Sequence, residues 1–147
     1  MVERKVLRVK AEALRDFCRQ VFERLGVPAE DAMVAADVLV SADLRGVDSH
    51  GVARLRRYVN GLRQGAMKPR PEIRLVRETP LTALMDGGAG LGQVVGVRAM
   101  RLAIEKALRS GVGLVAVRNS NHYGIAGYYA MMALEHDLIG LSMTNAS

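Results

Sequence analysis

Apolar residues recur every three or four positions along the first 65 residues, which is the period of a helix. Residues 11–25 carry apolar side chains at the spacing that buries one face of a helix, and Gly26 stands where a glycine commonly ends one. A second helix is expected from Pro28 to Leu44, because proline is favoured at a helix start. A third is expected from Ser49, as its N-cap, to just before Gly65. The sequence therefore predicts an N-terminal module of three helices.

The pattern changes after residue 66, where Pro69 and Pro71 force an extended path. The segments beyond are expected to be strands at 73–77, 81–85, 113–118 and 139–144, and helices at 93–108 and 125–136. Strands that alternate with helices are typical of α/β domains. We therefore expect a helical module at residues 1–66 and the beginning of an α/β domain at residues 67–147. So small a sheet would leave an unpaired edge, which suggests part of a longer protein.

Composition narrows the class of protein. The chain has 147 residues, of which 50% are apolar and 24% charged, and this balance excludes disordered or collagen-like protein. No uncharged apolar run reaches the roughly 18 residues of a membrane span, and no secretory signal precedes the helices. We therefore expect no membrane partner and, by default, a cytoplasmic location. The single cysteine, Cys18, cannot form an internal disulfide, which agrees with a reducing compartment.

The formal net charge of +6 raises the question of nucleic acid. The densest basic segment, residues 54–70, could be a phosphate-facing patch on a non-catalytic helical module that binds nucleic acid or a protein partner. The alternative is a solvated helix face. The remaining cations are scattered and no aromatic residues alternate with them, so we expect no nucleic-acid partner.

A glycine-rich segment at residues 87–92 stands between a predicted strand and a predicted helix, as in folds that hold a pyrophosphate. The required G-x-G-x-x-G spacing is absent, because Gln93 and Val95 occupy the positions that need glycine. The segment is either such a cradle in altered form or a tight strand-to-helix turn with positive φ angles. The spacing favours the turn.

Two short motifs could carry chemistry. If a helix starts at Ser49, His50 and Arg54 share one face, where an imidazole can give a proton to a carbonyl and a guanidinium can grip a carboxylate. Together they suit a 2-oxo acid, and Ser49 or Asp48 could orient the imidazole. The alternative makes Ser49 a cap, His50 a surface residue and Arg54 part of a basic face.

The second motif is the polar loop at residues 118–124, which follows a buried strand at the place where α/β sheets bind ligands. It contains His122, although its asparagines and serine could simply form a loop. His136 fits the last turn of a helix and is interpreted as structural. The three histidines lack metal-ligand spacing, so no metal is expected.

These motifs resemble those of a known family. The matching segments are residues 42–51 with Arg54 and Tyr58, residues 84–87 with Gly92 and Gln93, residues 117–124, and residues 139–145. They are similar in order and spacing to the type 2 malate/L-lactate dehydrogenases, a family that includes ureidoglycolate and sulfolactate dehydrogenases. Members are more than twice as long as this chain, so the resemblance makes it an N-terminal portion. The expected fold is α/β: a helical N-terminal module followed by part of a mixed β-sheet with flanking helices, in a nicotinamide-binding fold unrelated to the Rossmann type and incomplete in this chain.

The resemblance also implies roles for individual residues. His50 would be the proton donor to the substrate carbonyl, Ser49 would set its hydrogen bonding, and Arg54 would hold the carboxylate of a small 2-oxo or 2-hydroxy acid. His122 serves as the acid/base in some members. The cofactor, NAD or NADP, would lie along His122, Tyr123, Gly124, Ile125 and Ala126, with Thr144, Asn145 and Ala146 near the nicotinamide. A homodimer is implied as well.

Overall fold

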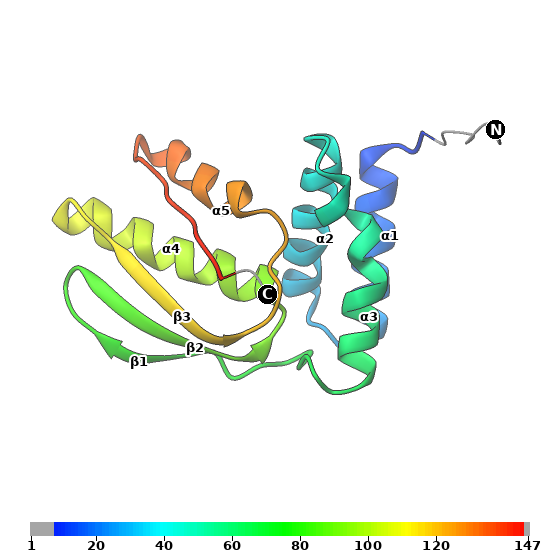
Figure 1. Ribbon diagram of the computed structural model, residues 1–147, viewed down its shortest axis with the longest axis horizontal. Coiled ribbons are helices and arrows are strands. Elements are labelled where there is room, and N and C mark those ends of the chain that lie inside the picture. Colours follow the sequence, from blue (N-terminus) through cyan, green and yellow to red (C-terminus); the bar gives the residue numbers. More distant parts are fainter. Residues whose placement is uncertain (1–7, 146–147) are drawn as a thin grey trace.

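The computed structural model describes residues 8–145, and it places a group of three helices beside a small sheet (Figure 1). One further helix packs on the sheet and another packs on that helix. The first group contains α1 (Ala11–Arg24), α2 (Ala29–Leu44) and α3 (Leu55–Arg63). We call it the helical module. It packs against the second half of the chain mainly through α2, which contacts both α4 (Gly92–Ser110) and α5 (Ala126–Met132).

The helices of this module form where the sequence predicts them, with one exception. The helix expected from Ser49 begins instead at Leu55, after two single 3-10 turns, η1 (Asp48–His50) and η2 (Val52–Arg54). Gly51 between them has an extended ψ of −150°, which interrupts the helix. The Asp43 carboxylate accepts the Val52 N–H at 2.9 Å and lies so close to Gly51 that a side chain there would collide with it. Ser49 makes no capping bond, so the N-cap prediction was wrong.

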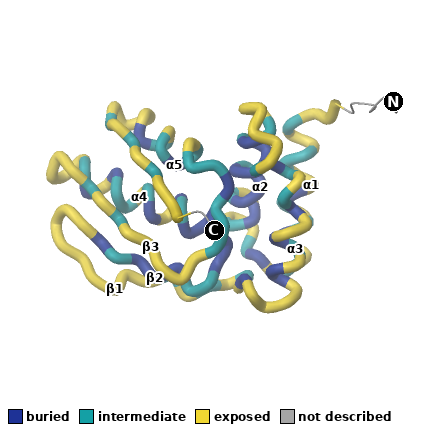
Figure 2. The backbone as a smooth tube through the Cα atoms, in the orientation of Figure 1, coloured by how far each residue is buried: buried dark blue, intermediate teal, exposed yellow. Residues whose placement is uncertain are grey.

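The centre of the helical module is closely packed with small and branched apolar side chains. The buried residues of helix α2 lie between Ala32 and Ala42, where Figure 2 shows mainly dark blue and teal. The core of the helical module includes Cys18 and Phe22 of α1, Leu39 of α2 and Tyr58 of α3, and it extends to Val94 of α4. Burial of this apolar area is the main stabilising contribution to the module.

The sheet has three strands, β1 (Arg74–Glu78), β2 (Thr82–Gly90) and β3 (Leu114–Ser120), in the order β1-β2-β3. The first pair is antiparallel and the second is parallel, with α4 (Gly92–Ser110) as the crossover. The expected mixed sheet with flanking helices is therefore confirmed. Its own core is small and consists of Met85 on β2 with Val95 and Ala99 on α4.

The glycine-rich segment is mostly strand rather than turn. β2 continues through Gly90, and positive φ angles at Gly88 and Ala89, both 58°, mark the irregularity in its pairing with β3. The change of direction into α4 falls at Leu91 alone. A run of glycines can thus form the bulged end of a strand as well as a turn, because both conformations can need positive φ angles.

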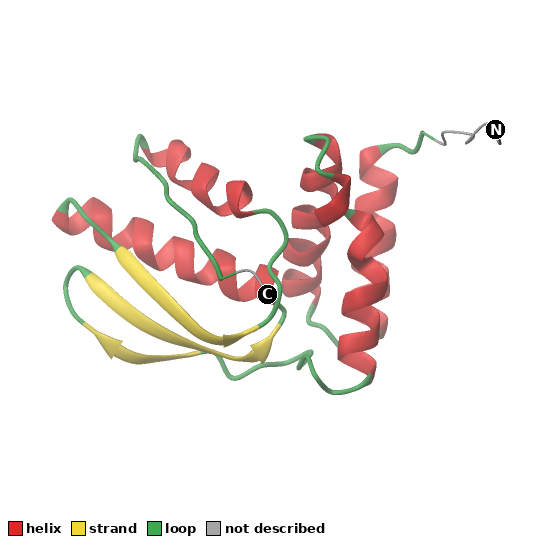
Figure 3. Cartoon of the chain, viewed as in Figure 1, coloured by secondary structure: helices red, strands yellow, loops and turns green. Residues whose placement is uncertain are grey.

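Two expectations near the C-terminal end also change. The helix predicted at 125–136 is divided into α5 (Ala126–Met132) and a 3-10 turn, η3 (Ala133–His136). Residues 139–144, predicted as a strand, form no ladder and are drawn as a loop in Figure 3. Their backbone packs on α5 instead, since a side chain at Gly140 would meet the Ala130 carbonyl oxygen. A strand needs a hydrogen-bonding neighbour, and within residues 8–145 this segment has none.

Candidate active site

The two candidate histidines lie face to face although they come from different halves of the molecule. His50 ends η1 and His122 lies in the loop between β3 and α5. Their rings are stacked, with centroids 5.4 Å apart and planes inclined by 24°. Both residues are only partly buried, so part of the pair remains accessible to solvent.

His122 is held from behind by a residue of the helical module. The Tyr58 hydroxyl lies 2.6 Å from Nδ1 of His122, and the Gly124 N–H points to the same nitrogen at 3.4 Å. Tyr58 is fully buried and packs edge-on against Phe22, with ring centroids 6.3 Å apart. The imidazole is therefore oriented by a side chain that is enclosed in the core of the helical module.

The surroundings of His122 favour its neutral form. Burial lowers the pKa of its imidazole, and the positive charges of Arg57, His50 and Arg54 lower this pKa further. Burial also raises the pKa of the Tyr58 hydroxyl to about 12, against smaller opposing effects of neighbouring charges and a hydrogen bond. Tyr58 therefore keeps its proton at neutral pH.

His50 and Arg54 are arranged around the peptide of Ser49. Ser49 Oγ lies 2.9 Å from Nδ1 of His50, as the sequence suggested for Ser49 or Asp48. Arg54 donates from Nε to the Ser49 carbonyl oxygen at 2.6 Å. Its terminal nitrogens make no hydrogen bond within residues 8–145, so the two-pronged end of the guanidinium is available to a carboxylate.

The other polar residues of the β3–α5 loop hold it in place. Asn119 donates to the buried Asp86 carboxylate at 2.9 Å, and Asn121 donates to the carbonyl oxygens of Ala89 and Gly90 at 3.1 and 2.9 Å. The Gly88 N–H, Asn119 and Arg118 together lower the pKa of Asp86, so it stays ionised. The asparagines therefore fix the loop to the bulged end of β2. The imidazole of His122, in the same loop, takes no part in these bonds.

The N-terminus of α4 lies directly under this loop. A side chain at Gly92 would come within 2.1 Å of the Asn121 carbonyl oxygen and 2.5 Å of that of His122. The loop thus occupies the space in which a Rossmann-type fold would bind a pyrophosphate. This geometry agrees with the missing glycine fingerprint.

The remaining residues of the predicted cofactor site are only partly gathered. Tyr123 stacks on Tyr129 with centroids 4.7 Å apart, and its hydroxyl lies 3.3 Å from Ser142. Gly124 is buried with φ 82°, and Ile125 and Ala126 are half-buried where α5 begins. Thr144 and Asn145 are exposed, and their one recorded side-chain bond joins Thr144 Oγ1 to the Asn145 carbonyl at 3.3 Å. Ala146 lies outside the described residues.

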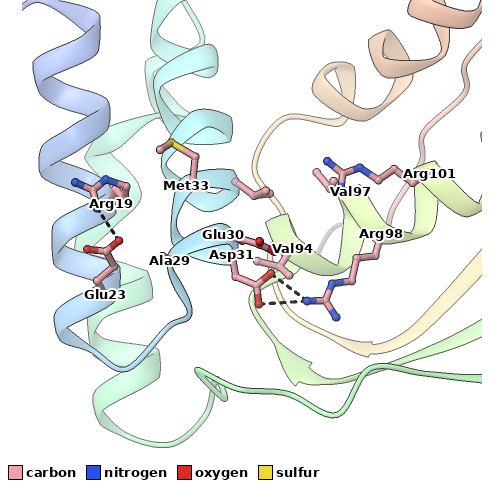
Figure 4. A pocket seen from close by; sticks show the side chains of 11 residues that line it. Arg19, Glu23, Ala29, Glu30, Asp31, Met33, Val94, Val97, Arg98 and Arg101 are labelled. Atoms are coloured by element: carbon pink, nitrogen blue, oxygen red, sulfur yellow. Dashed lines mark hydrogen bonds and ion pairs between the residues drawn. The ribbon is translucent and has the colours of Figure 1, made fainter.

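A separate groove of about 670 Å³ opens between α1, α2 and α4 (Figure 4). Apolar side chains such as Met33 and Val94 line it, and the ion pairs Arg19–Glu23 and Arg98–Asp31 cross its rim. None of its lining residues is a histidine, so it is distinct from the His50–His122 pair. Two of its three arginines are paired with these acids.

Sequence reasoning missed two residues that shape the site. Tyr58 and Asp86 stood within segments that resembled the family but received no role. Their contacts with the loop could not be predicted locally, because Tyr58 and His122 are 64 positions apart and Asp86 and Asn119 are 33 apart. No helix in residues 8–145 has the length and apolar character needed to cross a membrane. Within the same residues no three potential metal-binding side chains converge.

The fold is mixed α/β and lacks a Rossmann phosphate site. Its stacked histidines and the unpaired end of the Arg54 guanidinium define a class of non-Rossmann protein that can bind a carboxylate. The sequence model of the malate/L-lactate dehydrogenase family matches residues 9–147. The chain belongs to that family.

Several relatives support this assignment. The chain is 55% identical to malate dehydrogenase of Pyrococcus abyssi over 99% of its own length and 40% of that protein. The structure of malate dehydrogenase from Pyrococcus horikoshii is similar with a TM-score of 0.89 and 57% identity, covering 92% of this chain and 39% of the other. Sulfolactate dehydrogenase from Methanocaldococcus jannaschii gives a TM-score of 0.88 and 50% identity, covering 89% of this chain and 38% of the other. The chain thus spans about 40% of the length of the curated relatives it matches.

Proposed function

We propose that this chain forms the N-terminal portion of an NAD- or NADP-dependent dehydrogenase of small 2-hydroxy acids. The observation that carries the proposal is the stacked His50–His122 pair beside Arg54. Its relatives of 55% and 50% identity are named malate dehydrogenase and L-sulfolactate dehydrogenase. We therefore propose substrates of the malate or lactate type.

The residues present suit the two functional groups of such a substrate. The terminal nitrogens of Arg54 would donate two parallel hydrogen bonds to the carboxylate. The imidazoles would then face the adjacent carbonyl, where one of them donates a hydrogen bond or a proton as the alcohol forms, and accepts it in the reverse direction. Ser49 would hold the His50 ring through Nδ1, at the observed 2.9 Å.

The cofactor would lie on the half-buried surface of Tyr123, Ile125 and Ala126. These residues offer apolar side chains and peptide groups beside His122, which fits a flat nicotinamide ring. Gly124 is part of the same stretch, and Thr144 with Asn145 would approach the ring from the other side. When bound, the nicotinamide supplies or receives the hydride.

The proposal includes the organisation of the whole protein. Residues 1–66 would form the side that binds substrate and a second subunit, and residues 67–147 would begin the nicotinamide-binding domain. A homodimer and a cytoplasmic location complete it. The exposed apolar side chains of the sheet support a covered surface in the complete enzyme.

The test uses the complete enzyme, with oxaloacetate or pyruvate and reduced nicotinamide followed by its absorbance. His50→Ala is expected to lower kcat by about 100-fold or more if His50 exchanges the proton. Unchanged turnover would remove His50 from the mechanism and leave His122. Arg54→Ala is expected to raise KM for the 2-oxo acid while the affinity for the cofactor stays the same. Absence of reduction together with salt-sensitive retardation of DNA would favour the basic-module alternative instead.

A further inference from the structure

Helix α2 contacts both segments that carry the candidate histidines. Its Asp43 carboxylate accepts a backbone N–H of η2, two residues after His50, at 2.9 Å. The loop that carries His122 lies against the middle of the same helix, because a side chain at Gly124 would come within 2.8 Å of Val38 Cγ1. The position of His122 relative to His50 therefore depends on how this loop is held on α2.

A hydrogen bond between a hydroxyl and a carboxylate holds the loop there, at the residue next to Val38. The Tyr128 hydroxyl, in the first turn of α5, donates to Asp37 Oδ2 at 2.7 Å. Arg15 of α1 donates to the other oxygen, Oδ1, at 2.7 Å. Both oxygens of the Asp37 carboxylate therefore have a donor, and its side chain is fixed between α1 and α5.

The surroundings of Tyr128 keep its hydroxyl protonated. Burial raises the pKa of this hydroxyl, and the hydrogen bond to Asp37 and the negative charge of that carboxylate raise the pKa further. The positive charges of Arg101 and Arg15 oppose the rise less strongly. Tyr128 therefore remains the donor at neutral pH, and the bond to Asp37 persists.

The neighbouring tyrosine ties the loop to the sheet half instead. The Tyr129 hydroxyl donates to the Tyr123 carbonyl oxygen, and the two rings stack with centroids 4.7 Å apart. Tyr129 is buried against α4, where a side chain at Gly96 would come within 2.7 Å of its ring. The start of α5 thus has one anchor in each half of the molecule, and Tyr128 supplies the one in the helical module.

We propose that Asp37 is a positioning residue: it holds the Tyr128 hydroxyl, and with it the β3–α5 loop, on α2, and so sets the separation of the His122 and His50 rings. In the structure this separation is 5.4 Å between ring centroids. Asp37 is hydrogen-bonded to neither ring, so it acts only through α5 and the loop.

The catalytic part of this role deepens the proposed function and rests on it. Arg54 belongs to η2, so a carboxylate held by Arg54 would keep its place on the helical module if the loop shifted. His122 and the proposed cofactor stretch that follows it would move with α5. Because rates depend steeply on the alignment of reacting groups, such a shift lowers kcat more than it changes the binding of the 2-oxo acid.

Tyr128→Phe tests the role in the complete enzyme, because it removes the donor and keeps the ring. At a temperature well below unfolding we expect kcat to fall about 10-fold, with KM for the 2-oxo acid changed less than about twofold. Asp37→Ala should have the same effect. The double variant should be no slower than Asp37→Ala, since both substitutions remove the same bond.

Arg98→Gln is the matched control. Arg98 of α4 donates to Asp31 at 3.0 Å, so this pair also joins a carboxylate of α2 to the second half of the chain, but it involves neither α5 nor the loop. We expect a small loss of thermal stability, as for Tyr128→Phe, with kcat unchanged. A role in stability alone would leave kcat unchanged in both variants.

The histidine pair can be observed without turnover in the complete enzyme labelled with ¹³C-histidine. Stacked rings shift each other's ring-proton signals, so ¹H–¹³C spectra report their separation, and His50→Gln and His122→Gln variants assign the signals. We expect both signals to move in Tyr128→Phe and Asp37→Ala and to stay in place in Arg98→Gln.

Unchanged histidine signals and kcat in Tyr128→Phe would refute the role of Asp37, and so would equal effects in Arg98→Gln. Should Asp37→Ala fail to fold, Tyr128→Phe decides by itself. An enzyme whose signals move as expected but which reduces no 2-oxo acid would refute the proposed function alone. An active enzyme whose signals stay in place in Tyr128→Phe would refute the role of Asp37 alone.

Discussion

The helical module and the sheet bury their apolar side chains to very different extents. In the helical module Leu39 is 0% exposed and lies among other buried side chains. On the sheet Leu114 is 59% exposed, and all five residues of β1 are exposed. Each half contributes one histidine to the candidate site, and both halves help to position His122. The helical module supplies the buried hydroxyl of Tyr58. The sheet side fixes the loop that carries His122 through hydrogen bonds of Asn119 and Asn121.

The same substitution in the two halves gives the largest contrast. Leu39→Ala is expected to lower the free energy of unfolding by about 2–5 kcal/mol, because it leaves a cavity in a closely packed core. Leu114→Ala should change it by no more than about 0.5 kcal/mol, since that side chain has few neighbours to lose. Denaturant unfolding of both variants measures the difference. Equal losses of unfolding free energy would mean that Leu114 is as closely surrounded by other side chains as Leu39 is.

The seam between the halves is tested at Gly92. Gly92→Ala places a methyl group against the carbonyl oxygens of Asn121 and His122, so the loop must shift. We expect a loss of about 1–3 kcal/mol in unfolding free energy and lower activity of the complete enzyme. Gly127→Ala in α5 is the control, because nothing lies within 4 Å of the added carbon and alanine favours a helix. Equal effects of both variants would contradict the close contact at Gly92.

A polar link between the halves contributes less. The Tyr128 hydroxyl of α5 donates to the Asp37 carboxylate of α2 at 2.7 Å, and Arg15 donates to the other oxygen at 2.7 Å. Tyr128→Phe is expected to cost about 1 kcal/mol, since Asp37 is partly solvated and keeps its arginine. Tyr123→Phe, whose hydroxyl lies 3.3 Å from Ser142, should cost less. Thermal melts of the two variants in parallel decide whether the link matters.

The smallest effect concerns pH. Burial, assisted by Arg57, His50 and Arg54, lowers the pKa of His122 below its ordinary 6.5. The unfolded chain therefore binds this proton at a higher pH than the folded chain, and stability falls as pH drops below about 6.5 towards the folded pKa. His122→Gln should flatten this part of the profile measured by denaturant unfolding, whereas exposed His136→Gln should not. A steeper profile in His122→Gln would reverse the sign of the assignment.

Local patterns predicted most elements because they depend on neighbours in the chain. The stripe at residues 11–25 and the apolar run after Pro28 gave helices near their expected bounds. The helix start at Ser49 was wrong because a distant carboxylate, Asp43, holds residues 51–52 in another conformation. The strand at residues 139–144 was wrong because alternation shows which faces differ, not whether a partner strand exists.

The site followed the same rule. His50, Ser49 and Arg54 stand close together in the sequence, and the structure brings His122 to them. The residue behind His122 could not be predicted, since Tyr58 reads as one apolar position of a helix stripe. Its importance arises only when α3 and the β3–α5 loop meet.

The bond between Tyr58 and His122 also bears on the order in which this protein folds. It joins groups 64 positions apart, so it cannot form until the chain between them has already closed a long loop. The helical module consists of local contacts that form early, whereas the histidine pair must wait for the parallel pairing of β2 with β3. A refolding chain would therefore acquire its helices well before it acquires a place for substrate, and recovery of ligand binding would time the slowest step.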